Sequence, residues 1–216
     1  MQQNTVYVWD PLVRLFHWTL VLSFTIAYLT GEEENLWHIY SGYVVLGLIL
    51  FRFVWGFVGT PHARFRDFIY PPGEVSAYLK GVFTHRAKRY IGHNPAGGWM
   101  ILLLLTTLLV VSFSGLKVYA IEEGRGPLAG ISTELTAIGT VHASEDEDED
   151  EEREEREHGD EGAEEFWEEI HEASANFMLL LILLHVTGVF TSSLVHRENL
   201  VKAMITGRKQ APESTE

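Results

Sequence analysis

Four stretches of this 216-residue chain are strongly apolar, and this feature constrains the fold most. A helix of about 20 apolar residues crosses a hydrocarbon layer of roughly 30 Å. A backbone in lipid must satisfy its own hydrogen bonds, and a helix does so within a single segment. We therefore predict an all-α integral membrane protein, a four-helix bundle with spans at residues 12–30, 37–58, 96–116 and 166–195.

The charge of the chain is concentrated in one segment. Residues 145–169 carry seventeen acids and two arginines, a net of −15, whereas the whole chain carries −14. The remainder is nearly neutral, as expected of a membrane domain. We assign residues 1–143 and 166–216 to that domain, and residues 144–165 to an acidic low-complexity loop, disordered or loosely helical. The chain has no cysteine, which excludes disulfides, iron–sulfur clusters and thioether-linked haem, and we expect no nucleic-acid partner.

The positions of Lys and Arg predict the orientation in the membrane, because cytoplasmic loops carry more of them. The loop GEEEN after the first span has none. The basic side chains gather in the loop after the second span and in the C-terminal tail: Arg64, Arg66, Lys80, Arg86, Lys88, Arg89, Arg197, Lys202, Arg208 and Lys209. We expect both termini and this middle loop to be cytoplasmic and the acidic loop to lie outside. Within the middle loop, PPGEVSAYLKGVF predicts a short amphipathic helix on the inner surface.

Histidines mark two levels of the predicted bundle. His171 and His185 lie on nearly one face of one span, about 21 Å apart along its axis. Because successive spans run in opposite directions, His17 lies at the inner depth with His185, and His38 lies at the outer depth with His171. An imidazole in lipid needs a hydrogen bond, a charged partner or a metal. Two histidine pairs at two depths indicate two bis-histidine b-type haems.

Three cations and a fifth histidine are candidate neighbours of these haems. Arg52 follows His38 by fourteen residues, so it reaches the depth of the inner pair, where a haem propionate would supply its anion. Arg14 is placed to serve the same haem, and Lys117 the outer one. His93, in GHNP, is a candidate quinone-site residue. Simpler roles remain open: the cations extend to the membrane surface, and the histidines are capping or interfacial residues.

The motifs in this chain resemble those of the bacterial cytochrome b561 superfamily, which includes the b-type cytochrome subunits of nickel–iron hydrogenases. The matching motifs are RLFHW at 14–18, HIYSGYVVLGLILFRFVWGFVG at 38–59, GHNPAGG at 92–98 and H-x13-H at 171–185. The resemblance implies a multi-pass protein of the bacterial inner membrane that holds two haems b. It also implies electron exchange between the quinone pool and a partner on one membrane face, with the same four histidines as haem ligands.

Several functions remain open at this point. The acidic run departs from the family pattern and suggests electrostatic steering of a basic periplasmic redox protein, such as a cytochrome c. Within the family, the chain could instead anchor a hydrogenase-like oxidoreductase, or oxidise superoxide and reduce quinone. A small proton or metal transporter that uses intramembrane histidines belongs to another class. The direction of electron flow is not readable from the sequence, and a homo-oligomer is compatible with it.

Overall fold

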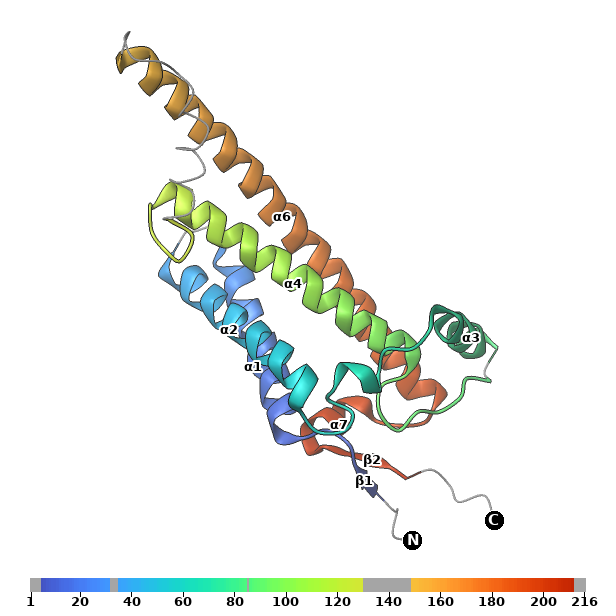
Figure 1. Cartoon of the computed structure of the whole chain (residues 1–216). Coiled ribbons are helices and arrows are strands. Elements are labelled where there is room, and N and C mark those ends of the chain that lie inside the picture. The colour runs from blue at the N-terminus through green and yellow to red at the C-terminus, as the bar shows by residue number, and fades with distance from the viewer. Residues whose placement is uncertain (1–4, 32–34, 85, 130–148, 212–216) are drawn as a thin grey trace, which may run out of the picture. The chain divides into compact units, whose positions relative to one another are not determined.

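The structure, a computed structural model, describes residues 5–31, 35–84, 86–129 and 149–211. It divides into two compact units, Met1–Thr106 with Met178–Glu216, and Thr107–Phe177. Among the described residues, four helices are long and apolar enough to cross a membrane, which confirms a long apolar helix at each predicted span (Figure 1). They are α1 (Pro11–Leu29), α2 (Leu36–Val58), α4 (Pro95–Glu122) and the Gly162–Val195 part of α6 (Glu149–Val195).

The helices begin where short polar side chains can cap them. Asp10 accepts a hydrogen bond from the backbone N–H of Val13 at 2.9 Å. Asn94 accepts one from the backbone N–H of Gly97 at 2.7 Å, and Pro95 follows it as the first residue of α4. A capping side chain satisfies an N–H that the helix leaves unpaired, and proline is well suited to the first turn. The predicted start of the third span is thereby confirmed.

Asp10 also ties the start of α1 to the end of α2, and these two helices contact each other. Its carboxylate accepts hydrogen bonds from the indole N–H of Trp55 at 3.3 Å and from the hydroxyl of Thr60. Burial by itself raises the pKa of Asp10, but the donors Thr60, Val13 and Trp55 outweigh it and hold the pKa below its usual value.

A small sheet joins the two ends of the described chain. Strand β1 (Thr5–Tyr7) pairs antiparallel with β2 (Arg208–Gln210), which follows the short helix α7 (Leu200–Thr206). Gly207 ends α7 with φ +78°, a conformation that favours glycine. Neither this sheet nor α7 was expected from the amino-acid sequence. The N- and C-terminal segments therefore lie together within the first unit, as an even number of spans requires; which membrane face they occupy stays a prediction.

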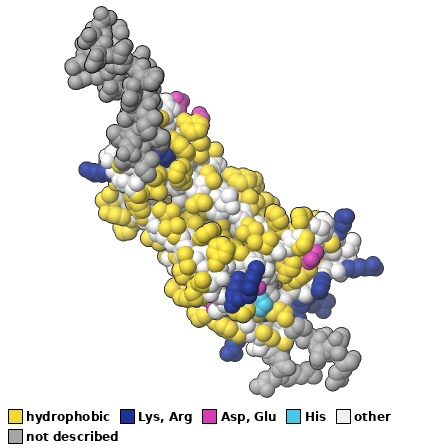
Figure 2. Space-filling view, viewed as in Figure 1, with side chains coloured by type: hydrophobic (Ala, Val, Ile, Leu, Met, Phe, Trp, Pro, Cys, Tyr) yellow, Lys and Arg dark blue, Asp and Glu magenta, His cyan; other side chains and the backbone are white. Residues whose placement is uncertain are grey.

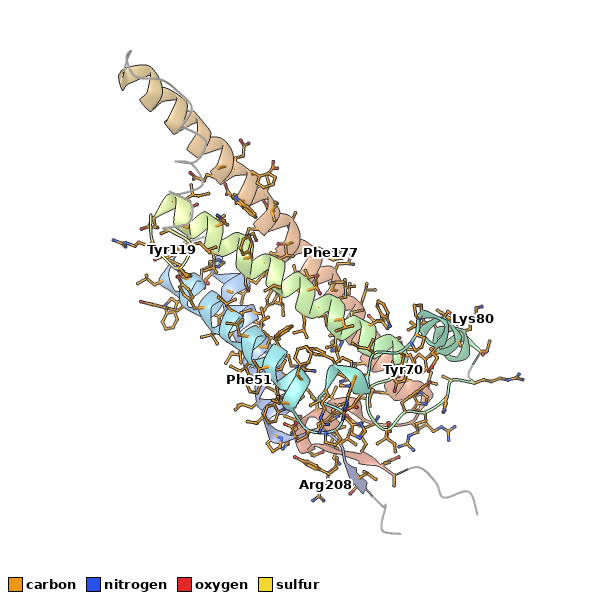
Figure 3. All side chains as sticks on the ribbon, viewed as in Figure 1. Phe51, Tyr70, Lys80, Tyr119, Phe177 and Arg208 are labelled. Atoms are coloured by element: carbon orange, nitrogen blue, oxygen red, sulfur yellow. The ribbon has the colours of Figure 1, made fainter. Side chains whose placement is uncertain are left out.

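The middle loop forms the amphipathic helix predicted for it, α3 (Pro72–Phe83), after a 3-10 turn η2 (Phe65–Asp67). Tyr78 is its buried residue, whereas Leu79 is exposed. The indole N–H of Trp99 in α4 donates to the carbonyl of Tyr70 at 2.9 Å, which fixes the loop to the start of that helix. Tyr70 is labelled in Figure 3.

The fourth long helix extends well beyond the predicted span. α6 starts at Glu149, so much of the segment expected to be an acidic loop is helical, while residues 144–148 lie outside the described residues. Glu, Ala and Arg are strong helix formers, which accounts for this extension. On the face shown in Figure 2, hydrophobic side chains cover most of the described surface of the helices, as a lipid environment would accept.

Candidate haem sites

The predicted inner histidines come together in the first unit. His17 of α1 and His185 of α6 lie near enough for their charges to interact. The Nδ1 atom of His17 is buried and has no hydrogen-bond partner. The edge of the indole of Trp18 meets the imidazole of His17, with ring centres 5.0 Å apart. A buried imidazole nitrogen without a hydrogen-bond partner suits a ring that binds a metal.

The predicted outer histidines are oriented by backbone carbonyls. His38 Nδ1 donates to the carbonyl of Ala27 at 2.9 Å, and His171 Nδ1 donates to that of Val111 at 3.0 Å. A carbonyl only accepts, so Nδ1 carries the proton and Nε2 of the neutral ring carries the lone pair. Metal-ligating histidines are commonly oriented in this way. His38 belongs to the first unit and His171 to the second, so their pairing stays a prediction.

His171 packs closely against a glycine and a serine of α4. A Cβ atom added at Gly115 would lie 2.8 Å from Cε1 of the imidazole, too close for an ordinary contact. The hydroxyl of Ser114, which is fully buried, lies 3.2 Å from His171 Nδ1. Sequence analysis did not single out these two residues. Small residues are common where membrane helices approach, so SFSG in the third span was only a weak signal.

Arg52 does not extend to the surface as the simpler prediction allowed. Its residue is 3 % exposed, and its guanidinium lies over the rings of Phe65 and Phe68, 5.1 and 5.6 Å from their centres. The Nη1 atom is buried and has no hydrogen-bond partner. Phenyl faces supply part of the negative environment that a buried guanidinium needs, but they accept no ordinary hydrogen bond. An acceptor oxygen at Nη1 would complete the site.

The other two candidate cations have partners that sequence analysis missed. Arg14 donates through Nη1 to the carbonyl of Ile205 at 2.5 Å, near the end of α7, while its buried Nε has no partner. In the second unit, the ammonium of Lys117 lies 6.0 Å from the ring centre of Trp167. The predicted propionate contacts of both remain predictions.

His93 is enclosed by aromatic rings. The ring centres of Trp9 and Phe68 lie 4.4 and 4.9 Å from that of His93, and its Nδ1 is buried without a hydrogen-bond partner. Burial, aided by the positive charges of Arg52 and Lys209, lowers the pKa of His93 to about 3. The ring is therefore neutral near pH 7 and carries one N–H donor and one lone pair.

Buried nitrogen atoms without a partner coincide with the residues chosen from the sequence. Across the described residues there are four such side-chain atoms: Arg14 Nε, His17 Nδ1, Arg52 Nη1 and His93 Nδ1. All belong to the first unit. Guanidinium nitrogens only donate, whereas an imidazole nitrogen can donate, accept or bind a metal. The set fits a bound group that offers both acceptor oxygens and a metal ion, and a haem with its propionates is such a group.

The family comparison agrees with this chemistry. Residues 8–207 match the model of the prokaryotic cytochrome b561 family. The chain belongs to that family. Membership makes it a multi-pass membrane cytochrome of the b type that functions in electron transfer, and it implies haem b.

Curated relatives of this cytochrome b561 family member share low identity over nearly the whole chain. The probable Ni/Fe-hydrogenase B-type cytochrome subunit of Azotobacter chroococcum mcd 1 is 25% identical, over 95% of this chain and 89% of the relative. The subunits so named from Azotobacter vinelandii and Rhizobium leguminosarum bv. viciae are 24% and 22% identical, over 95% and 97% of this chain and 89% and 90% of theirs. No solved structure gives a significant match.

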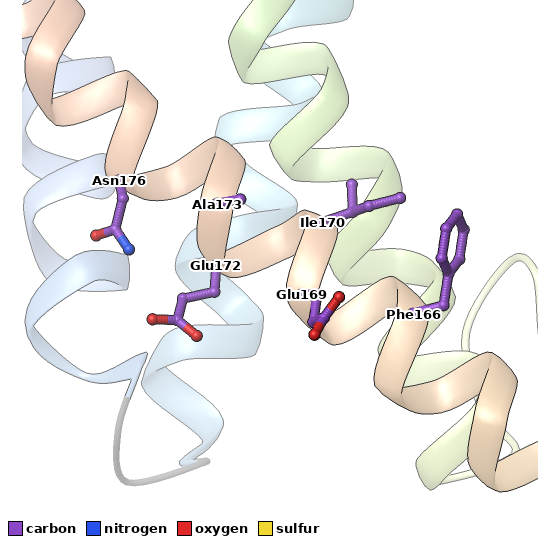
Figure 4. Close-up of a pocket in the computed structure, with 6 residues that line it drawn as sticks. All are labelled: Phe166, Glu169, Ile170, Glu172, Ala173 and Asn176. Atoms are coloured by element: carbon purple, nitrogen blue, oxygen red, sulfur yellow. The ribbon is translucent and has the colours of Figure 1, made fainter.

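The residues before and after His171 in α6 of this cytochrome line a groove (Figure 4). Phe166 and Ile170 supply apolar walls, while Glu169 and Glu172 supply carboxylates. The groove belongs to the second unit. Its chemistry suits a partner that presents both apolar and basic side chains.

Proposed function

We propose that this cytochrome b561 family member binds two haems b and passes electrons between the quinone pool and a redox partner on the opposite membrane face. One observation carries the proposal: the four buried, unpartnered nitrogens of the described chain belong to four residues that sequence reasoning had already placed at the inner haem or beside it. The haem supplies one-electron redox chemistry when bound; the chain supplies ligation, burial and charge.

Each haem has two histidine ligands in this proposal. His17 and His185 bind the inner iron, and His38 and His171 bind the outer iron. Support for the inner pair is their electrostatic proximity. Support for the outer ligands is the carbonyl that each Nδ1 contacts, because this contact orients Nε2 as the ligating atom.

Arginine and lysine side chains stabilise the propionates in this proposal. Arg52 and Arg14 serve the inner haem, and Lys117 serves the outer one. Arg52 is the best supported, since its Nη1 is buried and can be satisfied only by an acceptor. A buried cation disfavours the extra positive charge of an oxidised haem, so it favours the reduced form and shifts the potential of a nearby haem upward.

His93 is the proposed donor to a quinone at the inner face. Its neutral ring has an N–H to offer a quinone carbonyl, and Trp9 and Phe68 form apolar walls beside it. The electrostatic interaction of His93 with His185 supports a position close to the inner haem. A quinone there would exchange electrons with that haem over a short path.

Two kinds of partner are supported by different observations. The relatives named as hydrogenase subunits favour a hydrogenase-like subunit, so that the chain acts as its membrane anchor. The carboxylates of the α6 groove and the acidic run instead favour a basic soluble protein such as a cytochrome c. A stably bound subunit would co-purify at high salt. A steered soluble protein would react at a rate that falls steeply with ionic strength.

Haem content of the purified protein tests the central proposal. We expect the spectrum of low-spin b haem and two haems per chain. His171→Ala and His185→Ala should each leave one haem, because each change removes a ligand from a different iron. His62→Ala, which alters no proposed ligand, is the matched control and should keep both. If either ligand variant kept two haems, or lost both with the fold intact by circular dichroism, the pairing would be refuted.

A further inference from the structure

A groove outside the haem region lies between α3 and the segment 86–90. Tyr78 and Glu74 of α3 line one side, and Arg86, Lys88 and Tyr90 line the other. All belong to the first unit, so the groove can be described as one site. Neither electron transfer nor haem binding uses any of these side chains.

The walls of this groove, called here the α3 groove, are held in place by close contacts. The backbone N–H of Arg86 donates to the carbonyl of Gly81 at 2.8 Å. A Cβ atom at Gly81 would lie 3.0 Å from Cα of Ala87, so the helix and the segment approach as closely as a glycine allows. The rings of Tyr78 and Tyr90 meet edge to face with centres 5.8 Å apart. The groove is therefore formed in advance of any ligand.

Cations dominate the rim of the α3 groove. Arg86 and Lys88 are exposed, and no salt bridge in the described part of the chain involves either of them. The ammonium of Lys88 lies 5.7 Å from the ring centre of Tyr90. Lys80 lies on the same helix, α3, outside the lining (Figure 3), and Glu74 is the one acid of the lining. Lys and Arg side chains gather around this part of the molecule (Figure 2).

Exposed apolar side chains accompany these cations. On α3, Leu79 is 44 % and Phe83 84 % exposed. The segment 86–90 ends shortly before α4, a candidate membrane span, begins at Pro95. A short helix with exposed apolar residues and flanking cations, next to the end of a span, is suited to the headgroup region of a membrane.

We propose that the α3 groove binds the headgroup of one anionic glycerophospholipid. Arg86 and Lys88 bind the phosphate, because both are unpaired cations on one wall of a preformed groove. Glu74 accepts hydrogen bonds from headgroup hydroxyls, which a glycerol headgroup provides and a choline headgroup does not. Leu79 and Phe83 contact the acyl chains. Phosphatidylglycerol has all three features.

Native mass spectrometry of the detergent-solubilised protein tests this site. We expect phosphatidylglycerol to bind more tightly than phosphatidylcholine of the same chain length. Each cation contributes about fivefold to binding of an anionic lipid, so Arg86→Gln/Lys88→Gln should weaken phosphatidylglycerol binding roughly 25-fold. The control Arg66→Gln/Arg208→Gln removes the same amount of charge outside the groove. It should change the affinity for phosphatidylglycerol by less than about threefold. An equal loss in both double variants would show a diffuse charge effect and overturn the proposal.

Protection of the unmodified protein gives a second test that needs no variant to fold. Phosphatidylglycerol should slow tryptic cleavage after Arg86 and Lys88 but not after Arg208. Protection by phosphatidylcholine to the same extent would overturn the requirement for an anionic headgroup. Equal protection by inorganic phosphate alone would overturn the assignment to a lipid. The assignment would also be overturned if an acidic protein protected these two cleavage sites and phosphatidylglycerol did not.

Discussion

Glu198 is the single carboxylate of a buried ion cluster, and its removal gives a sharp prediction. The side chains of Glu198 and Lys209 are 5% and 6% exposed, and the carboxylate lies 3.3 Å from the ammonium. Arg89 donates to the same carboxylate and, at 2.7 Å, to the carbonyl of Gln210. Lys209 also donates to the carbonyl of Tyr90 at 3.1 Å. The cluster therefore fastens β2 to the middle loop.

The cost of Glu198→Ala is set by what happens to Lys209. Burial lowers the pKa of Lys209, and Glu198 offsets part of that effect. Without the carboxylate, the lysine must either stay charged in a buried site or lose its proton. Deprotonating an ordinary lysine at pH 7 costs about 5 kcal/mol, which limits the penalty. Breaking buried pairs typically costs about 3–5 kcal/mol. Arg89 is 31% exposed and adds little, because water solvates its charge in part.

Hydrogen exchange can measure this cost locally. The backbone N–H groups of Val8 and Trp9 donate to the carbonyl of Gly207, at 2.8 and 3.1 Å, so they report on docking of the C-terminal segment. A loss of about 3–5 kcal/mol predicts an increase of roughly 10²- to 4 × 10³-fold in their exchange through opening. The matched control is Glu123→Ala, whose pair with Arg125 at 3.7 Å is exposed. There, exchange at the end of α4 should rise by no more than about fivefold.

A second substitution should restore the protection that Glu198→Ala removes. Glu198→Ala combined with Lys209→Met removes both charges of the buried pair and should recover most of the lost protection, because an apolar pair carries no desolvation penalty. If Glu198→Ala and Glu123→Ala changed exchange equally, or if the double variant were worse than Glu198→Ala alone, the account of a buried, mutually dependent pair would be refuted.

Two further changes test the packing of the helices. The pKa of Asp10 is lowered in the folded protein, so its stabilisation is present above the unfolded pKa of about 4 and is lost as the pH falls through the folded value. Asp10→Asn should lower the stability at pH 7 by about 1 kcal/mol and flatten its fall below pH 4, measured by thermal unfolding in detergent. An unchanged acid profile would contradict this. Gly115→Ala should displace His171 and reduce haem content towards one per chain, whereas Gly73→Ala, with open space around it, should not.

The four spans were predictable because hydropathy and length report directly on a membrane environment. The helix start at Asn94 and the helix α3 were predictable because capping and amphipathic patterns are local. The pairing of Thr5–Tyr7 with Arg208–Gln210 was not, because the two strands are three residues long and lie at opposite ends of the chain. Strands this short carry no periodic pattern, so only the folded chain reveals their register.

The buried ion cluster was not predicted, because its two cations were used only to infer the orientation in the membrane. Lys209 and Arg89 were counted among the cations of loops and tails, which are normally in contact with water or headgroups. Their burial depends on Glu198, and nothing in the local sequence distinguishes that acid from the others. For Arg14 the same limit applied, since its acceptor, the carbonyl of Ile205, belongs to a helix that was not predicted.

The candidate haem ligands follow from spacing, whereas their orientation depends on atoms that no sequence pattern marks. His38 and His171 are oriented by the carbonyls of Ala27 and Val111. Every residue offers a carbonyl, so helix packing rather than side-chain chemistry selects these acceptors. A site oriented in this way needs no particular side chain as the hydrogen-bond acceptor for Nδ1. That is compatible with family membership at only 22–25% identity to the curated relatives.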